Sequence, residues 1–136
     1  MKLNHLCAAL FIGGSASAAD APPPKPRLVD HNGSLMQIML LPNDGIDIVY
    51  QQVRPALWGY AVPGQIAVHG RWRQGVLYAT AYVTGRCGPV PYPVSGGEEH
   101  GVLVLRGPAP LLDPWSCQVL QWIWSANSVL AFTPVR

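Results

Sequence analysis

The feature that most constrains this chain is an alternation of apolar and polar residues with period two, which begins near Asn32 and continues to the C-terminus. Glycine and proline interrupt it about every 8 to 12 residues, a spacing typical of all-β sandwiches and barrels. The alternating runs are SLMQIMLL, IDIVYQQV, QIAVHGRW, VLYATAYVT, VPYPVS, GVLVLRG, VLQWIW and SVLAFTPV. No run shows a convincing helical period. We therefore predict an all-β fold, a small antiparallel barrel or two-sheet sandwich of about eight strands.

The segment RCGPVPYPVSGG (residues 86–97) places prolines at alternate positions, Pro89, Pro91 and Pro93. Proline has no backbone N–H, so this spacing forbids ladder hydrogen bonds along one side of the strand. We predict an edge strand, or a bulged segment at a barrel seam, which also discourages edge-to-edge aggregation. The following Ser95-Gly96-Gly97 is predicted to turn the chain. The sequence around Ser95 has no Gly-x-Ser-x-Gly elbow, so we expect no nucleophile there.

The first 19 residues have the organisation of a secretory signal peptide. Lys2 precedes a short apolar run, LCAALFIGG, and small residues that suit a signal peptidase follow in SASAAD. A membrane anchor would need about 20 apolar residues, far more than this run supplies. We divide the 136-residue chain into a signal peptide (1–19), an extended or disordered Pro-rich leader (20–30) and a single β domain (31–136).

Two cysteines, Cys87 and Cys117, remain after removal of the signal peptide, which carries Cys7 away. An even number of cysteines in an exported chain predicts a disulfide. Metal-binding or reactive thiols are the alternative, but the chain has no Cys-x-x-Cys and no histidine close to either cysteine. We expect a disulfide-bonded protein of the periplasm or the extracellular space.

Several of these motifs resemble a group of small exported proteins of Gram-negative bacteria. The resemblance lies in HNGSLM, GRW with the later LYATAYV, CGPVPYPVSG, LRGPAP and a further cysteine, and it extends from about His31 to Phe132. It implies a small secreted β domain with one disulfide, and it implies no catalytic residue. This chain departs from the group in segment 54–64, which is richer in aromatic residues.

Charge and metal-ligand spacing exclude several classes of partner. The formal charge falls from +2 to +1 when Lys2 is removed, so the basic field that nucleic acid binding requires is missing. No second apolar span follows, so we expect no membrane insertion after signal cleavage. The remaining histidines have no partner at metal-ligand spacing, and Asp44 and Asp47 suit a turn better than a calcium loop. We therefore expect no cofactor and no metal.

The segment RPALWGYAVPG (residues 54–64) is the first candidate site. It is bounded by proline and glycine, and surface loops carry function more often than strands do. Tryptophan, tyrosine and arginine dominate the energetics of protein interfaces. We predict that Arg54, Leu57, Trp58 and Tyr60 contact a partner. The alternative is a loop that folds back and plugs one end of the barrel.

A cationic strand face is the second candidate site. Arg71 and Arg73 share one face with His69, opposite Trp72, and arginine grips carboxylates with two parallel hydrogen bonds. We include Arg71 and Arg73 among the predicted binding residues. The alternative is the solvent face of an amphipathic strand. The remaining tryptophans, Trp115, Trp122 and Trp124, are predicted to lie mostly in the core.

These observations predict a non-enzymatic binding or protein-interaction module, for example an inhibitor, whose partner is another envelope or extracellular protein. Three alternatives remain open. A small barrel can carry one apolar ligand, an envelope subunit would assemble through its strand edges, and a hydrolase is the least favoured. The oligomeric state is left open by the sequence.

Overall fold

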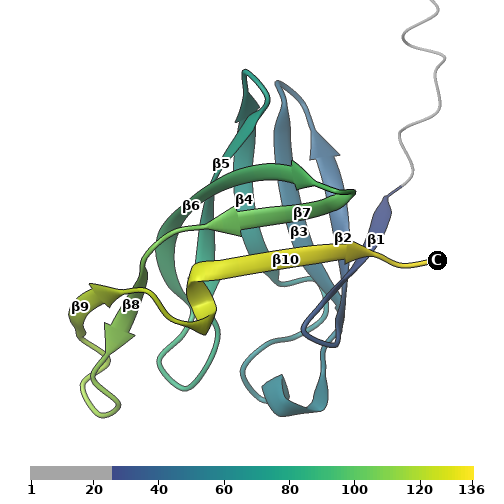
Figure 1. Ribbon diagram of the computed structural model, residues 1–136. Helices are drawn as coiled ribbons and strands as arrows, with labels where there is room; N and C mark the ends of the chain where they lie inside the picture. Colours follow the sequence, from purple (N-terminus) through teal and green to yellow (C-terminus); the bar gives the residue numbers. More distant parts are fainter. Residues whose placement is uncertain (1–25) are drawn as a thin grey trace, which may run out of the picture.

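The computed structural model describes residues 26–136 (Figure 1), so the predicted signal peptide and residues 20–25 of the predicted leader lie outside the described part. It forms ten strands and two short 3₁₀ segments. The strands are β1 (Arg27–His31), β2 (Ser34–Leu41), β3 (Gly45–Gln52), β4 (Ile66–Arg73), β5 (Val76–Val83), β6 (Val90–Glu99), β7 (Val102–Arg106), β8 (Ala109–Leu112), β9 (Val119–Ile123) and β10 (Val129–Pro134). The 3₁₀ segments are η1 (Pro55–Leu57) and η2 (Ala126–Ser128).

Eight of these strands close into an antiparallel barrel in the order β1-β10-β7-β6-β5-β4-β3-β2. The remaining two, β8 and β9, form a separate hairpin that is inserted between β7 and β10 and projects from the barrel (Figure 1). The all-β prediction is confirmed, and of its two forms the barrel is the one observed. The Cys87–Cys117 disulfide is also present. Within residues 26–136, no helix has the length and apolar character needed to cross a membrane.

The predicted start of the β domain at His31 is too late. Arg27–His31 forms β1, which pairs with both β2 and β10 and closes the barrel. Val29 in its middle is fully buried. The run of prolines immediately before Arg27 obscured this strand, because the prolines made the whole stretch read as an extended leader.

The prolines of β6 lie where the strand has a neighbour on one side only. Residues from Val90 to Val94 pair with β5, and pairing with β7 begins at Ser95. The prediction of a strand that pairs on one side only therefore holds for the first half of β6, whereas Ser95 and Gly96 in its second half pair with both β5 and β7. The predicted turn at Ser95-Gly96-Gly97 is wrong, because β6 continues to Glu99 and the chain turns at residues 100–101. Position 96 requires glycine because the backbone of β7 passes close to it. A Cβ atom on residue 96 would lie 1.9 Å from the Val104 carbonyl oxygen.

Large apolar side chains fill the interior of the barrel. Fully buried members come from most of its strands and include Val29, Met36, Ile46, Ile48, Val68, Leu77, Leu105 and Phe132. Their inward orientation follows from the alternation in the sequence, since every second side chain of a strand faces the same side. The barrel is therefore held by a packed core.

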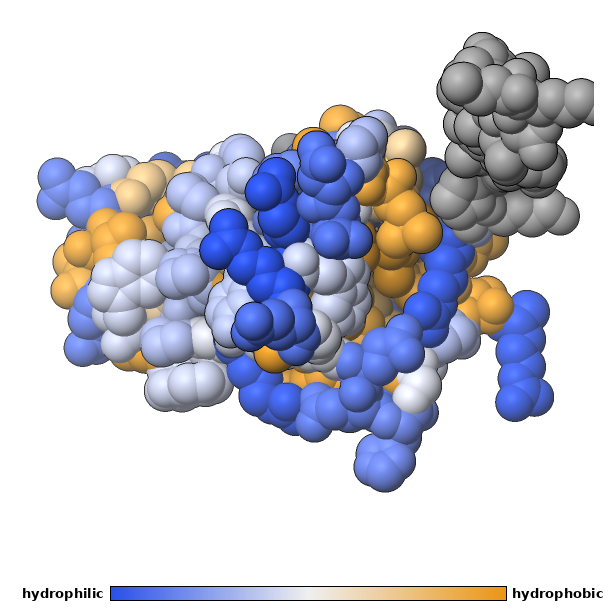
Figure 2. Space-filling model, turned by 90° about the horizontal axis from the view of Figure 1, so that it is seen from above, coloured by the Kyte–Doolittle hydropathy of each residue, from blue (hydrophilic) through white to orange (hydrophobic). Residues whose placement is uncertain are grey.

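The two ends of the barrel differ in their connections (Figure 1). At one end, called here the turn end, short connections at residues 42–44, 74–75 and 100–101 join the strands. Figure 2 looks down on this end and shows hydrophilic side chains at the hairpin tips. The opposite end, the loop end, carries the two-residue β1–β2 turn (residues 32–33) and the longer segments 53–65, 84–89 and 107–128, which include η1, η2 and the β8–β9 hairpin.

Candidate functional site

Segment 53–65 at the loop end both plugs the barrel and presents aromatic side chains. Val53 and Ala61 are buried and Leu57 packs partly buried against the core, so the plug predicted as the alternative is present. Trp58 and Tyr60 point outward and are 68% and 49% exposed. Their exposure fits the predicted contact role, whereas Leu57 is turned toward the core.

The exposed Trp58 is held in a defined position. Its indole Nε1 donates a hydrogen bond to the Val53 carbonyl at 2.9 Å. The Leu57 N–H bonds to the Arg54 carbonyl at 3.0 Å and the Ala61 N–H to the Leu57 carbonyl at 3.1 Å, which closes the two turns around the indole. A shallow hollow lies beside the ring, lined among others by Gly59 and Pro63. The segment therefore presents a fixed aromatic surface.

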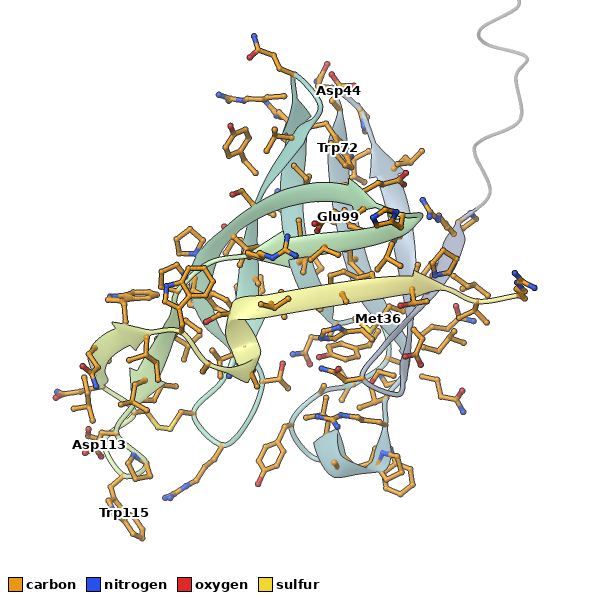
Figure 3. All side chains as sticks on the ribbon, viewed as in Figure 1. Met36, Asp44, Trp72, Glu99, Asp113 and Trp115 are labelled. Carbon is orange, nitrogen blue, oxygen red and sulfur yellow. A yellow bond between two sulfur atoms is a disulfide. The ribbon has the colours of Figure 1, made fainter. Side chains whose placement is uncertain are left out.

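The tip of the β8–β9 hairpin is a second rigid projection, visible at Asp113 and Trp115 in Figure 3. The carboxylate of Asp113 accepts hydrogen bonds from the N–H groups of Trp115 and Ser116, both at 2.8 Å. These two bonds stabilise the charged form and lower the pKa of Asp113. The disulfide to Cys87 ties the tip to segment 84–89.

Segment 84–89 also braces the indole of Trp115. The Arg86 guanidinium donates to the Pro114 carbonyl at 2.9 Å and lies 5.2 Å from the centre of the Trp115 ring. Such a cation–π contact orders an exposed ring without burying it. Trp115 is 81% exposed, so it projects into solvent from a constrained position.

The prediction that Trp115, Trp122 and Trp124 belong to the core is wrong. All three are at least half exposed, and Leu120 beside them is 59% exposed. The alternation correctly predicts a strand, β9, but this strand pairs only with β8 and leaves the barrel, so its apolar residues are not covered by the core. Sequence reasoning thus missed the hairpin as a site. The signal that could have indicated the hairpin is the sequence of its tip, where Trp115 lies between Pro114 and Cys117.

A polar cavity of about 90 Å³ lies just inside the barrel at the loop end. Its polar lining comes from the β1–β2 turn, the barrel wall and the long segments, namely His31, Asn32, Tyr50, Arg54, Tyr82, Thr84, Tyr92 and Asn127. The Tyr92 hydroxyl donates to the Asn127 carbonyl at 2.7 Å, and the Tyr50 hydroxyl lies 3.4 Å from Thr84 Oγ1. The sequence predicts that Arg54 contacts a partner beside Trp58, but its side chain faces inward and lines this cavity.

His31 forms part of the wall of this cavity. Its Nδ1 donates to the Ala131 carbonyl at 2.9 Å, because a carbonyl can only accept, and its ring stacks on Phe132 with centroids 4.7 Å apart. Burial lowers the pKa of His31; the bond to Ala131 opposes that shift, and the nearby Arg54 charge adds to it. The imidazole is therefore neutral near pH 7.

Arg71 and Arg73, the second candidate site, lie at the turn end and are separated from the first. Both are exposed on β4 and line an open hollow with Tyr78 and Thr80 of the neighbouring strand β5. On the same face His69 hydrogen-bonds Asp47. The structure therefore divides the predicted residues between two distant surfaces.

Comparisons of the chain with protein-family models, with curated proteins and with solved structures find no match. The resemblance to small exported β proteins therefore stays a prediction. Among residues 26–136, no three histidine, cysteine, aspartate or glutamate side chains are grouped so that they could hold a metal ion.

Proposed function

We propose that this protein is a non-enzymatic binding module of the periplasm or extracellular space, and that its loop end contacts a protein partner. The observation that carries the proposal is the distribution of tryptophan. Of the five tryptophans in the chain, four are exposed at the loop end, at positions 58, 115, 122 and 124. Water-exposed aromatic surface is unfavourable unless something covers it, and tryptophan is enriched in interface hot spots.

The rigidity of both projections supports this proposal. A side chain that is already ordered loses little conformational entropy when it is covered by a partner. Trp58 is fixed by its indole hydrogen bond, and Trp115 by Arg86 and the disulfide-linked tip. The disulfide also fits the proposed compartment, since disulfides persist in oxidising surroundings.

Two of the three alternatives from the sequence, the carrier and the envelope subunit, receive less support. A carrier of drug-sized ligands needs a pocket of about 300–1,000 Å³. The cavity inside the loop end measures about 90 Å³, and a hollow of about 310 Å³ at the turn end, lined among others by Ile38, Trp72 and Leu103, lies at the lower limit of that range. A subunit that assembles through strand edges needs free edges, and closure removes most of them from the barrel. In the described part of the chain, free edges remain at the β8–β9 hairpin and along Val90–Val94 of β6, where Pro91 and Pro93 cannot donate hydrogen bonds.

Partner capture with matched variants tests the proposal. The oxidised mature protein is immobilised and exposed to an envelope extract of the organism that produces it, and bound proteins are quantified by mass spectrometry. We expect Trp58→Ala and Trp115→Ala to lose one common partner by at least about tenfold, with melting temperatures close to that of the parent. Tyr78→Ala, an exposed aromatic at the turn end, is the control. Equal capture by all variants would refute the proposal.

A further inference from the structure

The guanidinium group of Arg54 carries hydrogen-bonding capacity that the described residues leave unused. Its Nε is shielded from solvent and has no acceptor among residues 26–136. The ion pairs found in this part of the chain join Arg27 to Glu98, His69 to Asp47 and Arg106 to Glu99, so none involves Arg54. A buried donor without an acceptor is costly and uncommon in native proteins.

The position of Arg54 is fixed by its neighbours. Its backbone N–H donates to the hydroxyl of the buried Ser34 at 3.0 Å, and its carbonyl accepts the first hydrogen bond of η1. The aliphatic part of the side chain lies close over Gly33 in the β1–β2 turn. These contacts direct the side chain into the wall of the 90 Å³ cavity. The β1–β2 turn, β2 and η1 therefore all contribute to its position.

The cavity around Arg54 has the size and chemistry of a site for one small anion. Hydroxyl groups of Tyr50, Thr84 and Tyr92 contribute neutral polar atoms, while Leu57 and Phe132 supply apolar wall. Arg54 is the only side chain with a fixed charge that lines it among the described residues. One planar guanidinium matches one carboxylate through two parallel hydrogen bonds, and phosphate recognition would call for more positive charge.

We propose that this cavity binds a carboxylate group, and that Arg54 is its principal ligand. The group belongs either to a free short carboxylic acid or to an aspartate or glutamate side chain of a macromolecule. Its apolar part would rest against Leu57 and Phe132. The inference concerns the isolated chain and stands whether or not the loop end has a protein partner.

Titration of the oxidised mature protein, followed by nuclear magnetic resonance of the Arg54 Nε–H and nearby amides, tests this inference. The probes are sodium acetate and the acetyl-glutamate amide, against sodium chloride at equal ionic strength. We expect saturable shifts with a millimolar dissociation constant that centre on Ser34, Arg54 and Thr84, while chloride gives none. Tighter binding of acetate indicates a free acid, and tighter binding of the glutamate derivative indicates a protein side chain.

Two variants separate recognition from simple charge attraction. Arg54→Lys keeps the charge and most of the stem but loses the planar fork, and we expect at least about tenfold weaker binding. Arg73→Lys at the turn end is the matched control and should bind like the parent. If neither probe gives saturable shifts, or Arg54→Lys binds equally well, the inference is wrong. Should Arg54→Lys fail to fold, shifts in the parent that map outside the cavity would overturn it equally.

Discussion

The two ends of the barrel differ in the length and structure of the connections between their strands. At the turn end, connections of two or three residues are enough to join neighbouring strands. At the loop end, three longer segments join strands beside the two-residue β1–β2 turn, and a disulfide and an extra hairpin are added that barrel closure does not require. Loops on a rigid scaffold are where binding residues concentrate, so the additions support the proposal that the loop end contacts a partner.

Tryptophan shows the same difference at the level of single side chains. Trp72 near the turn end is partly buried and packs against the core, whereas Trp115 at the loop end is mostly exposed (Figure 3). The same residue type therefore stabilises the fold at one end and remains available for contact at the other. The following predictions test this division, starting with the largest expected effect.

Removal of the disulfide should produce the largest loss of stability. The bridge spans a sequence separation of 30, so the chain-entropy relation predicts that Cys87→Ala with Cys117→Ala lowers the free energy of unfolding by about 3.7 kcal/mol. Urea denaturation measures this. Hydrogen exchange should also show the β8–β9 amides losing protection before those of the β2–β3 hairpin. Equal loss at both ends would contradict the view that the hairpin is a stapled addition.

The tryptophans of the two ends should respond differently to truncation. Trp72→Ala removes a ring packed against the core and should cost about 2–4 kcal/mol. Trp115→Ala removes an exposed ring and one cation–π contact, and should cost no more than about 1 kcal/mol. Thermal or urea unfolding of the pair decides this. A cost at Trp115 equal to that at Trp72 would mean that the hairpin tip serves stability rather than contact.

Tyr92 in the cavity at the loop end should give the fold an alkaline transition. Burial raises the pKa of Tyr92 to about 12, and the neighbouring Tyr50 adds to the rise. The hydroxyl stays neutral in the folded state while the unfolded chain ionises near pH 10, so stability is complete below pH 10 and falls between about pH 10 and 12. Unfolding measured across this range should show the loss in the parent and a smaller one in Tyr92→Phe.

Ion pairs at the turn end should have the smallest effect. Arg27 Nη1 lies 2.9 Å from Glu98 Oε1, and both side chains are about half exposed, at 44% and 53%. Exposed pairs of this kind contribute about 0–1 kcal/mol. A double-mutant cycle with Arg27→Gln and Glu98→Gln should give a coupling energy at the low end of this range. A coupling well above it would show that the turn end depends on charge as well as on packing.

The sequence predicts the barrel wall well because alternation encodes which side of a strand is buried. The run SLMQIMLL coincides with β2, and VLYATAYVT extends one residue beyond β5. Alternation does not tell whether a partner sheet covers the apolar side, so it wrongly predicts a core position for Trp122 and Trp124. β8 was missed because it is short and contains Pro110.

The candidate site was predicted only in part for a related reason. Trp58 and Tyr60 could be identified because proline and glycine bound their segment. The grouping of Arg54 with His31 and Tyr92 depends on barrel closure, which brings together residues that no local pattern connects.

Site-specific photo-crosslinking in the living producer organism tests the central claim most directly. A benzophenone amino acid replaces Trp58, Trp115 or, as the control, Tyr78, which is exposed in the hollow formed with Arg71 and Arg73. Our account predicts that light attaches one and the same partner at positions 58 and 115 and none at 78. Adducts at position 78 alone would place the contact on the arginine face at the turn end and contradict the account.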